Sequence, residues 1–245
     1  MTGTPLLKCA GVSKRFGGIR ALDGVDLEVG EGEIIGLVGP NGSGKTTLLS
    51  CIAGSHSVSS GTIELAGHDI ARSAPHRRAH AGIARTFQVP RPLGSFTVVE
   101  NVAMSMMFGR DRVARTAALD RADLVLERVG LDAHRDRAVG VLTLHERKFL
   151  EIARALALDP RLILLDEVLG GLNPAEAAEG MSLIASLRDS GVAVVYIEHN
   201  VRAVASLADR MYVLDRGRNL AHGSPEAVLA DPSVVAAYLG GEVDA

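Results

Sequence analysis

One segment of the chain has the residue types and spacing of a loop that holds phosphate groups. Over residues 39–46 it has a glycine, four further residues, a Gly-Lys pair and a hydroxyl residue. The glycines let the backbone curl so that its N–H groups point inward, and a following helix turns its positive end toward the phosphates. We predict that Lys45 reaches the β- and γ-phosphates of a nucleotide and that the Thr46 hydroxyl ligates Mg²⁺. The predicted nucleotide-binding residues are Gly39, Pro40, Asn41, Gly42, Ser43, Gly44, Lys45, Thr46 and Thr47.

A pair of acids follows an apolar run later in the chain. Residues 162–165 are Leu-Ile-Leu-Leu, a pattern typical of a buried strand, and Asp166 and Glu167 come directly after them. Asp166 is placed to bind Mg²⁺ through water, and Glu167 is placed to polarise an attacking water. Two adjacent acids at a strand end are also typical of an N-cap for the next helix. The presence of the phosphate loop favours the catalytic interpretation.

The elements that must position these residues follow from the apolar pattern. Up to about residue 70, short apolar runs alternate with Gly and Asp, which predicts strands joined by turns. The predicted strands are residues 22–29, 34–38 and 62–65. The phosphate loop follows the second of these strands and leads into a helix over 46–53, which ends at Gly54.

The later segments predict a helical lobe and then a parallel sheet. Pro90 and Pro92 open an extended piece, and helical periodicity follows over 98–108 and 116–129. Beyond this lobe, the predicted elements are helices at 151–158 and 175–189 and buried strands at 162–165 and 192–197. Continuous apolar strands that alternate with helices indicate an α/β fold whose parallel sheet is covered on both faces.

Composition excludes several classes of protein. The chain of 245 residues is 47% hydrophobic and 22% charged, which predicts a sizeable core and excludes disordered, collagen-like and coiled-coil chains. Its net charge of −3 gives no field that would attract nucleic acid or acidic lipid. Cys9 and Cys51 are predicted to be unpaired thiols in a reducing cytosol. Only four lysines occur, so the position of each is informative.

With the phosphate loop and the acid pair in this order, the sequence resembles the ATP-binding subunits of ABC transporters from about Leu6 to Leu239. The resemblance implies a P-loop NTPase (RecA-like) core with a mostly parallel sheet, an N-terminal antiparallel β subdomain and an inserted helical lobe. It implies ATP and Mg²⁺ as cofactors. In a single ABC-type domain over 1–245, it assigns residues 1–88 and 156–245 to the core and 89–155, with the signature, to the helical lobe.

The resemblance also assigns roles to single residues. Phe16, next to two glycines, matches the aromatic residue that stacks on adenine, and Gln88 matches the glutamine that touches the metal and opens the helical lobe. The implied metal site is therefore Thr46, Gln88 and Asp166. His199 matches the histidine that contacts the γ-phosphate and the attacking water, which makes Glu167 and His199 the catalytic pair. By contrast, His76 and His80 stand among arginines and are predicted to lie on a solvated helix face.

The chain departs from the family at the signature. Where the family has Leu-Ser-Gly-Gly-Gln, which caps the nucleotide of the other subunit in a head-to-tail dimer, this chain has Leu142-Thr143-Leu144-His145-Glu146. Thr143 keeps a hydroxyl, but Leu144 and His145 place a Cβ where glycine allows close approach or positive φ. Glu146 adds a negative charge near phosphate that Arg147 or Lys148 would have to compensate.

Asn173 stands at another nucleotide-contacting position, where many members of the family have an aspartate. Two hypotheses follow from the changed signature. The site that it caps is the weaker of two unequal sites, or this subfamily uses another signature of normal strength.

Four short sequence segments, at 82–88, 97–102, 170–174 and 237–240, are similar to those of the branched-chain (hydrophobic) amino acid uptake subfamily. The resemblance implies an importer ATPase that forms a homodimer or a heterodimer with a second ATP-binding subunit. It implies polytopic membrane permease subunits as partners, a solute-binding protein as an indirect partner, and no nucleic acid. The expected location is peripheral, on the cytoplasmic face of the cell membrane.

Other functions stay open at this point. The ATP-binding subunits of amide, urea and lipopolysaccharide-export transporters have similar sequence segments. A soluble ABC ATPase acting on DNA or ribosomes would need a longer insertion than the stretch between Gln88 and Leu142, or a second ATPase unit. A small-molecule kinase or a GTPase is disfavoured because the chain has no Asn/Thr-Lys-x-Asp guanine motif.

Overall fold

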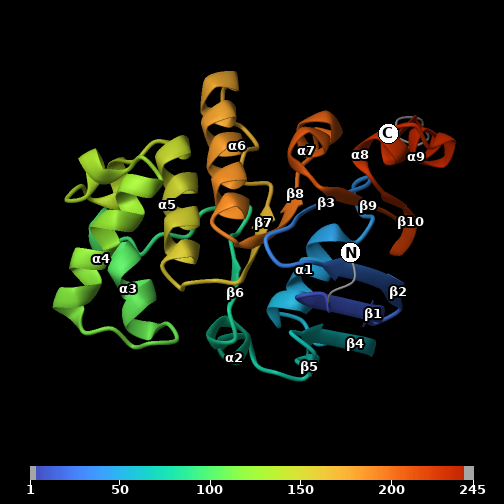
Figure 1. Cartoon of the computed structure of the whole chain (residues 1–245), viewed down its shortest axis with the longest axis horizontal. Coiled ribbons are helices and arrows are strands. Elements are labelled where there is room, and N and C mark those ends of the chain that lie inside the picture. Colours follow the sequence, from blue (N-terminus) through green and yellow to red (C-terminus); the bar gives the residue numbers. More distant parts are fainter. Residues whose placement is uncertain (1–3, 240–245) are drawn as a thin grey trace.

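The computed structural model describes residues 4–239, which form two β-sheets and a cluster of helices (Figure 1). The smaller sheet is antiparallel and has the strand order β2-β1-β4-β5. Its strands are β1 Leu7–Phe16, β2 Ile19–Val29, β4 Ser60–Leu65 and β5 His68–Asp69. This sheet is the antiparallel N-terminal part that the family resemblance implied.

The larger sheet is mostly parallel and has the strand order β10-β9-β3-β8-β7-β6, with only β10 antiparallel to its neighbour. Its strands are β3 Ile34–Val38, β6 Ile83–Arg85, β7 Leu162–Asp166, β8 Ala193–Ile197, β9 Arg210–Asp215 and β10 Arg218–Gly223. Every residue of β3, β7 and β8 is buried. They lie side by side in the middle of the sheet and run parallel, so their carboxyl ends meet on the same side of the sheet.

Helices cover both faces of the larger sheet. The helices of the core are α1 Lys45–Ala53, α2 Pro75–His80, α6 Pro174–Asp189, α7 Val201–Leu207, α8 Pro225–Leu229 and α9 Pro232–Leu239. Alternate residues of the strands face opposite sides, so Ile35 and Leu37 pack with α1 and the smaller sheet, whereas Ile34 and Val38 pack on the side of α6 and α7. The predicted α/β fold with a doubly covered parallel sheet is confirmed.

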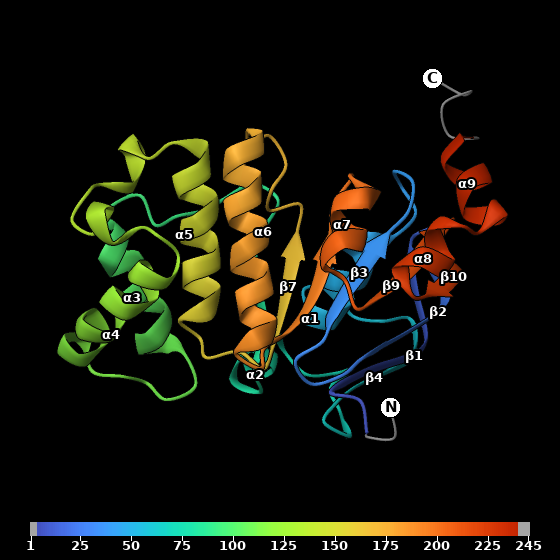
Figure 2. The same ribbon diagram turned by 45° about the horizontal axis from the view of Figure 1, so that its top comes forward.

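The remaining helices gather at one end of the molecule, beside α6 (Figure 2). They are α3 Val98–Phe108, α4 Arg115–Arg128 and α5 Leu144–Leu156, with the short 3₁₀ turns Asp132–His134 and Val139–Val141 between α4 and α5. They form the inserted helical lobe that the resemblance implied. The division of the chain at residues 88/89 and 155/156 stays a prediction.

One local prediction was wrong in its bounds. The helix predicted at 151–158 is α5, which begins at Leu144, because Thr143 and Glu146 form a capping box in which each accepts the other's backbone N–H. The segment with His76 and His80 is helix α2, on which His76 is exposed and His80 is half-buried, so the predicted solvated face is confirmed for His76 and in part for His80, whereas Arg78 of the same helix is buried. Its guanidinium donates to the carbonyls of Cys51 and Ile52 at the last turn of α1.

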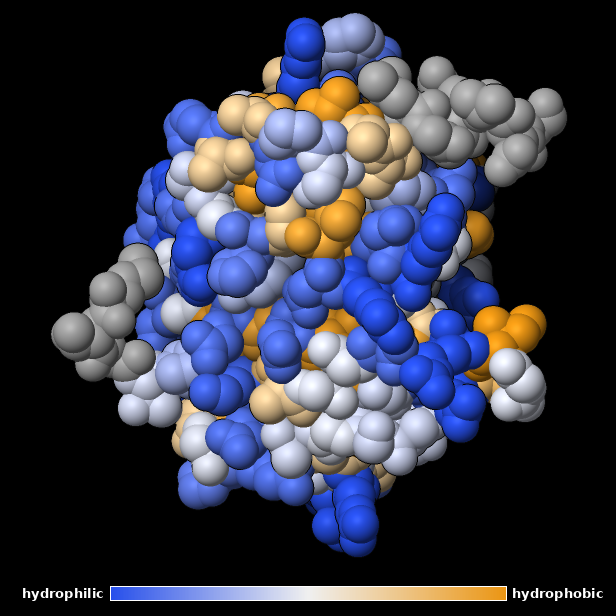
Figure 3. All heavy atoms as spheres, turned by 90° about the vertical axis from the view of Figure 1, so that its right-hand side faces the viewer, coloured by the Kyte–Doolittle hydropathy of each residue, from blue (hydrophilic) through white to orange (hydrophobic). Residues whose placement is uncertain are grey.

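Cys9 and Cys51 are both buried and unpaired, as predicted. Among residues 4–239, no helix has the length and apolarity that crossing a membrane requires. The face at the end with α9 and β10 is mostly hydrophilic, with hydrophobic residues scattered among the polar ones (Figure 3).

Candidate functional site

The phosphate loop, residues 39–46, has the backbone conformation that its glycines allow. Gly39, Gly42 and Gly44 have φ of 146°, 76° and 105°. A Cβ at Gly39 would lie 2.1 Å from the carbonyl oxygen of Leu214, so only glycine fits there. Helix α1 starts after Gly44 with no side-chain cap, which leaves its first N–H groups available to an anion.

Lys45 lies folded back on this loop. Its Nζ donates to the carbonyl oxygens of Gly39 and Pro40 at 2.8 and 2.9 Å, and only 6% of the residue is exposed. Burial lowers the pKa of the ammonium group, although the charges of Glu167 and Asp166 oppose that shift. The lysine is thus held at the loop by acceptors that phosphate oxygens can replace.

Asp166, at the end of β7, lies between the loop and an arginine. The Thr46 hydroxyl is 3.3 Å from its Oδ1, and Arg85 donates to its Oδ2 at 3.0 Å. The same guanidinium donates to Ser50 on α1 at 2.8 Å. Arg85 therefore pairs with the buried carboxylate and fixes its direction relative to α1.

Glu167 has a left-handed backbone, with φ of 52°. Such a conformation costs a non-glycine residue about 1–2 kcal/mol, so the surrounding contacts must hold it. Its carboxylate Oε2 accepts the Gln88 side-chain amide, and its Oε1 lies 2.9 Å from His199 Nε2. The structure thus brings Gln88, Glu167 and His199 together, although they come from three separate segments.

A hollow lies over the phosphate loop, and Glu167 lines it, whereas Gln88 and His199 do not. Its lining residues are Ala21, Asn41, Gly42, Gly44, Lys45, Thr46, Thr47 and Glu167. The alternative interpretation of the acid pair as a helix N-cap is wrong, because the next helix, α6, begins only at Pro174.

Phe16 is not among the residues that line this hollow. It ends β1 at a tight Gly17-Gly18 turn, is 42% exposed, and packs edge to face against His56 with ring centroids 5.1 Å apart. Its ring is therefore accessible to a ligand, and the stacking on adenine stays a prediction.

The Thr46 hydroxyl and the Asp166 carboxylate are oxygen ligands that suit Mg²⁺. A hydroxyl and a carboxylate are hard ligands, and Mg²⁺ at nucleotide sites usually takes one or two of them together with phosphate oxygens and water. Within residues 4–239 there is no group of three or more His, Cys, Asp or Glu side chains that would hold a metal by itself. The arrangement fits a metal that arrives with a nucleotide.

Comparisons with known proteins agree with this geometry. The ABC transporter family pattern matches residues 22–170, and a pattern described as branched-chain amino acid ATP-binding cassette transporter matches 218–244. The high-affinity branched-chain amino acid transport ATP-binding protein LivG of Salmonella typhimurium is 39% identical over 96% of this chain and 98% of its own. The chain belongs to the ABC transporter family.

Solved ABC structures have the same fold. An ABC transporter cassette in its ADP conformation is 32% identical, with a TM-score of 0.87 over 97% of this chain and 100% of its own. A dimeric cassette in a post-hydrolysis state, bound to ADP and Pi, is 25% identical, with a TM-score of 0.81 over 89% of this chain and 98% of its own. As a member of this ATPase family, the chain binds and hydrolyses ATP, and ABC cassettes work as dimers with membrane permeases.

The ABC signature segment, residues 142–146, has a different role within the chain from the one its composition suggested. Thr143 is the N-cap of α5, and Leu144 and His145 belong to the helix, so neither has the positive φ that would strain a side chain. Leu144 is 47% exposed. The expected backbone strain is therefore absent at these two residues, whereas their effect on close approach to a phosphate stays a prediction.

Glu146 is held by groups other than the predicted cations. Its carboxylate accepts the Thr143 N–H at 2.7 Å and lies 3.1 Å from His134 Nε2. Burial alone would raise the pKa of Glu146, but the Thr143 N–H and the nearby His134 lower it. Arg147 and Lys148, the two cations that would have to compensate this charge near phosphate, donate to backbone carbonyls and not to Glu146.

Asn173 also caps a helix. Its side-chain oxygen accepts the N–H groups of Ala175 and Glu176 at 3.0 Å each, which closes the first turn of α6. Within one chain, neither Asn173 nor the signature segment lines the hollow over the phosphate loop. Their assignment to nucleotide binding therefore depends on a second subunit and stays a prediction.

Sequence reasoning missed three charged residues at the site, namely Arg85, Lys148 and Glu198. Arg85 pairs with Asp166, and the other two are buried beside the loop that follows Glu167. The signal for Arg85 was its place in the segment 82–88, which is similar to the branched-chain amino acid uptake subfamily and ends at Gln88. The signal for Lys148 was the scarcity of lysine.

Proposed function

We propose that the chain is the ATP-hydrolysing subunit of an importer for branched-chain or other hydrophobic amino acids. The observation that carries the proposal is the convergence of Lys45, at the start of α1, with Glu167 and His199, which follow the adjacent strands β7 and β8. The name of the LivG relative and the match over residues 218–244 support the substrate class.

In the proposed reaction, Glu167 accepts a proton from the water that attacks the γ-phosphate. Gln88 and His199 contact its two carboxylate oxygens, so they fix the direction in which the base points. Lys45 exchanges the carbonyls of Gly39 and Pro40 for phosphate oxygens. These roles divide the work into binding by the loop and water activation by Glu167.

We propose that Thr46, Asp166 and Gln88 hold the Mg²⁺ that accompanies ATP. The distance of 3.3 Å between the Thr46 hydroxyl and Asp166 supports this set of ligands. Gln88 uses its N–H on Glu167, which leaves its carbonyl oxygen for the metal or its water. When bound, the ion would neutralise charge that develops on the phosphates.

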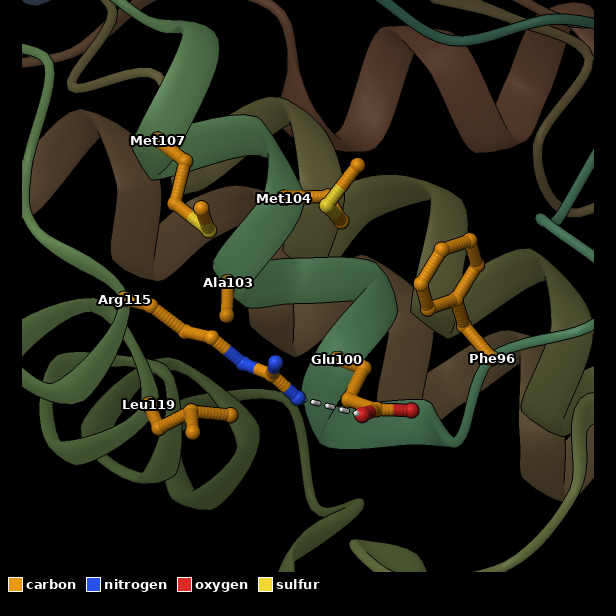
Figure 4. A pocket seen from close by; sticks show the side chains of 7 residues that line it. All are labelled: Phe96, Glu100, Ala103, Met104, Met107, Arg115 and Leu119. Carbon is orange, nitrogen blue, oxygen red and sulfur yellow. Dashed lines mark hydrogen bonds and ion pairs between the residues drawn. The ribbon is translucent and has the colours of Figure 1, made fainter.

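The permease is proposed to dock on the helical lobe, residues 89–155. An apolar pocket there is lined by side chains of α3, α4 and the loop before α3 (Figure 4), namely Phe96, Glu100, Ala103, Met104, Met107, Arg115 and Leu119. Glu100 and Arg115 form an ion pair of 3.3 Å at its rim. The chain between Gln88 and Phe96 links this pocket to Glu167, which supports a role in coupling.

The experiment that tests this function is transport into proteoliposomes. The chain is reconstituted with its permease subunits, a second ATP-binding subunit and the solute-binding protein. We expect leucine, isoleucine or valine to stimulate ATP hydrolysis and to be taken up. If only an amide or urea stimulates ATP hydrolysis, or if lipopolysaccharide is exported, the proposed substrate class is wrong.

The peripheral location on the cytoplasmic face of the cell membrane is tested by fractionation. We expect the chain to be extracted with detergent together with polytopic membrane proteins. Sedimentation with ribosomes would instead support a soluble ABC ATPase without a transport role.

We further propose that the dimer has two unequal sites. The signature segment of this chain lacks both glycines and keeps only the Thr143 hydroxyl, so the site that it caps in the partner would be the weaker one. The site built on Lys45 would use the signature of the partner and keep full strength.

The prediction is that Lys45→Ala in this chain lowers the ATPase rate more than the matching change in the partner subunit. Equal losses would support the alternative, a signature of normal strength or a homodimer.

A further inference from the structure

Two buried charged side chains, neither of which the proposed mechanism uses, contact the loop after β7. We call residues 167–170 the Glu167 loop. Lys148 of α5 is 6% exposed, and its Nζ donates to the carbonyl oxygens of Glu167 and Gly170 at 3.0 and 2.6 Å. Glu198, which follows β8, is 8% exposed, and its carboxylate accepts the Leu169 N–H at 2.7 Å. The peptide groups of the Glu167 loop are therefore bonded to an ammonium group and to a carboxylate.

Keeping these charges out of water is costly, so their contacts with the loop must be strong. Burial lowers the pKa of Lys148, and the charges of Glu198 and Glu167 act in the opposite direction. Burial raises the pKa of Glu198, which the Leu169 N–H and Lys148 partly offset. A buried charge is tolerated where hydrogen bonds replace its water, and the peptide groups of the Glu167 loop provide them.

The contacts act on the one residue of the site that has a strained backbone. Glu167 has φ of 52°, its N–H donates to Ile197 at the end of β8 at 3.0 Å, and its carbonyl oxygen accepts Lys148. Both peptide groups of Glu167 are thus fixed, one by the sheet and the other by the helical lobe. A loop released from Lys148 could relax toward an ordinary conformation and turn the carboxylate away from His199.

We propose that Lys148 is a positioning residue that couples the orientation of α5 to the carboxylate of Glu167. The proposal rests on the role of Glu167 as the base. The same helix begins at the signature segment, since Thr143 caps it five residues before Lys148. A movement of α5 when a second subunit seats its nucleotide at that end therefore changes the position of the base in this chain. Lys148 thereby makes hydrolysis here depend on the state of the neighbouring site.

The test compares variants in the assembled dimer. Lys148→Met removes the donors but keeps the length of the side chain, and we expect kcat for ATP to fall about 10- to 100-fold. The Kd and KM for ATP should stay within about twofold, because Lys148 does not contact the phosphate loop; a KM that rises as kcat falls would assign a general structural role instead. Lys148→Arg, which keeps the donors and the charge, should recover most of kcat. Lys8→Met, an exposed lysine paired with Glu28, is the matched control and should change nothing.

A double variant separates positioning from a general loss of structure. If Lys148 acts through Glu167, Lys148→Met should cause no further loss in the Glu167→Gln background in single-turnover measurements. The same fold-loss in both backgrounds, or an unchanged kcat in Lys148→Met alone, would overturn the inference. If Lys148→Met fails to fold, Lys148→Gln is judged by the same criteria. Normal turnover in Glu167→Gln itself would instead contradict the proposed function.

Discussion

At the scale of single residues, the site depends on how one carboxylate is held. Glu167 has contacts on all sides: Gln88 and His199 at its carboxylate, β8 at its N–H, and Lys148 at its carbonyl. Asp166, its neighbour, is instead paired with Arg85 and faces Thr46. Two adjacent acids thus have different surroundings, which suits the separate roles proposed for them, metal binding by Asp166 and proton transfer by Glu167.

This difference predicts the behaviour of Glu167→Gln. The amide keeps the size of the side chain but accepts no proton, so we expect ATP to bind normally while kcat falls about 100-fold or more. The variant should also favour the closed dimer with ATP, which size-exclusion chromatography detects. His199→Ala should lower kcat as well, because it removes the contact at Oε1 of Glu167. Unchanged turnover in either variant would remove that residue from its proposed role.

Residues that lie next to a recognisable motif could be predicted from the sequence, and those joined to it only in space could not. Lys45 and Thr46 follow from the spacing of the loop, and Asp166 follows from its place after an apolar strand. Lys148 reaches Glu167 across 19 positions of the chain. Nothing in the local pattern of α5 shows that this lysine turns inward, because that depends on how the helical lobe packs against the core.

At the scale of elements, the ends of strands and helices are fixed by polar contacts that hydrophobic periodicity does not show. Capping boxes set the starts of α5 and α6, and Arg78 closes the end of α1. The sequence predicted α3 at its observed bounds, since its apolar residues recur at helical spacing. It placed the start of α5 too late because the first turn of that helix consists largely of polar residues.

The bidentate pair between Glu33 and Arg210 predicts a pH dependence of stability. It joins the residue before β3 to the first residue of β9 at 2.6 and 2.9 Å, and Glu33 is 3% exposed. Burial would raise the pKa of Glu33, but Arg210 and the Gly30 N–H lower it below its ordinary value. The pair therefore stabilises the fold above the unfolded-state pKa of about 4.3, and this contribution is lost as the pH falls through the lower folded-state pKa.

Urea unfolding of Glu33→Gln should show this dependence. We expect the loss in free energy of unfolding, relative to the natural chain, to be largest near neutral pH and to shrink below pH of about 4. Glu28→Gln is the control, since its pair with Lys8 is exposed to solvent and should contribute little to stability at either pH. A loss that is equal at neutral and acid pH would show that Gln fails to fit for steric reasons.

At the scale of the whole molecule, one continuous segment of the chain joins the site around Glu167 to the pocket of the helical lobe. It leaves β6 at Arg85, passes Gln88 beside Glu167, and reaches Phe96 at the pocket (Figure 4). A second connection, through Lys148, runs from Glu167 into α5. Rigid helices and two such links allow a rearrangement at the nucleotide to move the lobe as a body.

This arrangement predicts that the pocket matters for coupling and not for hydrolysis itself. Met104 is half-buried on α3, and Met104→Glu places a charge in an apolar pocket without touching the phosphate loop. The isolated subunits should therefore keep their basal ATPase rate, while solute-stimulated ATPase and uptake in proteoliposomes fall at least about tenfold. Leu124→Lys, on the exposed face of α4 and outside this pocket, is the matched control and should leave uptake unchanged. Normal uptake by Met104→Glu would move the permease contact to another face of the lobe, whereas a lost basal rate would show that the pocket supports the fold of the cassette.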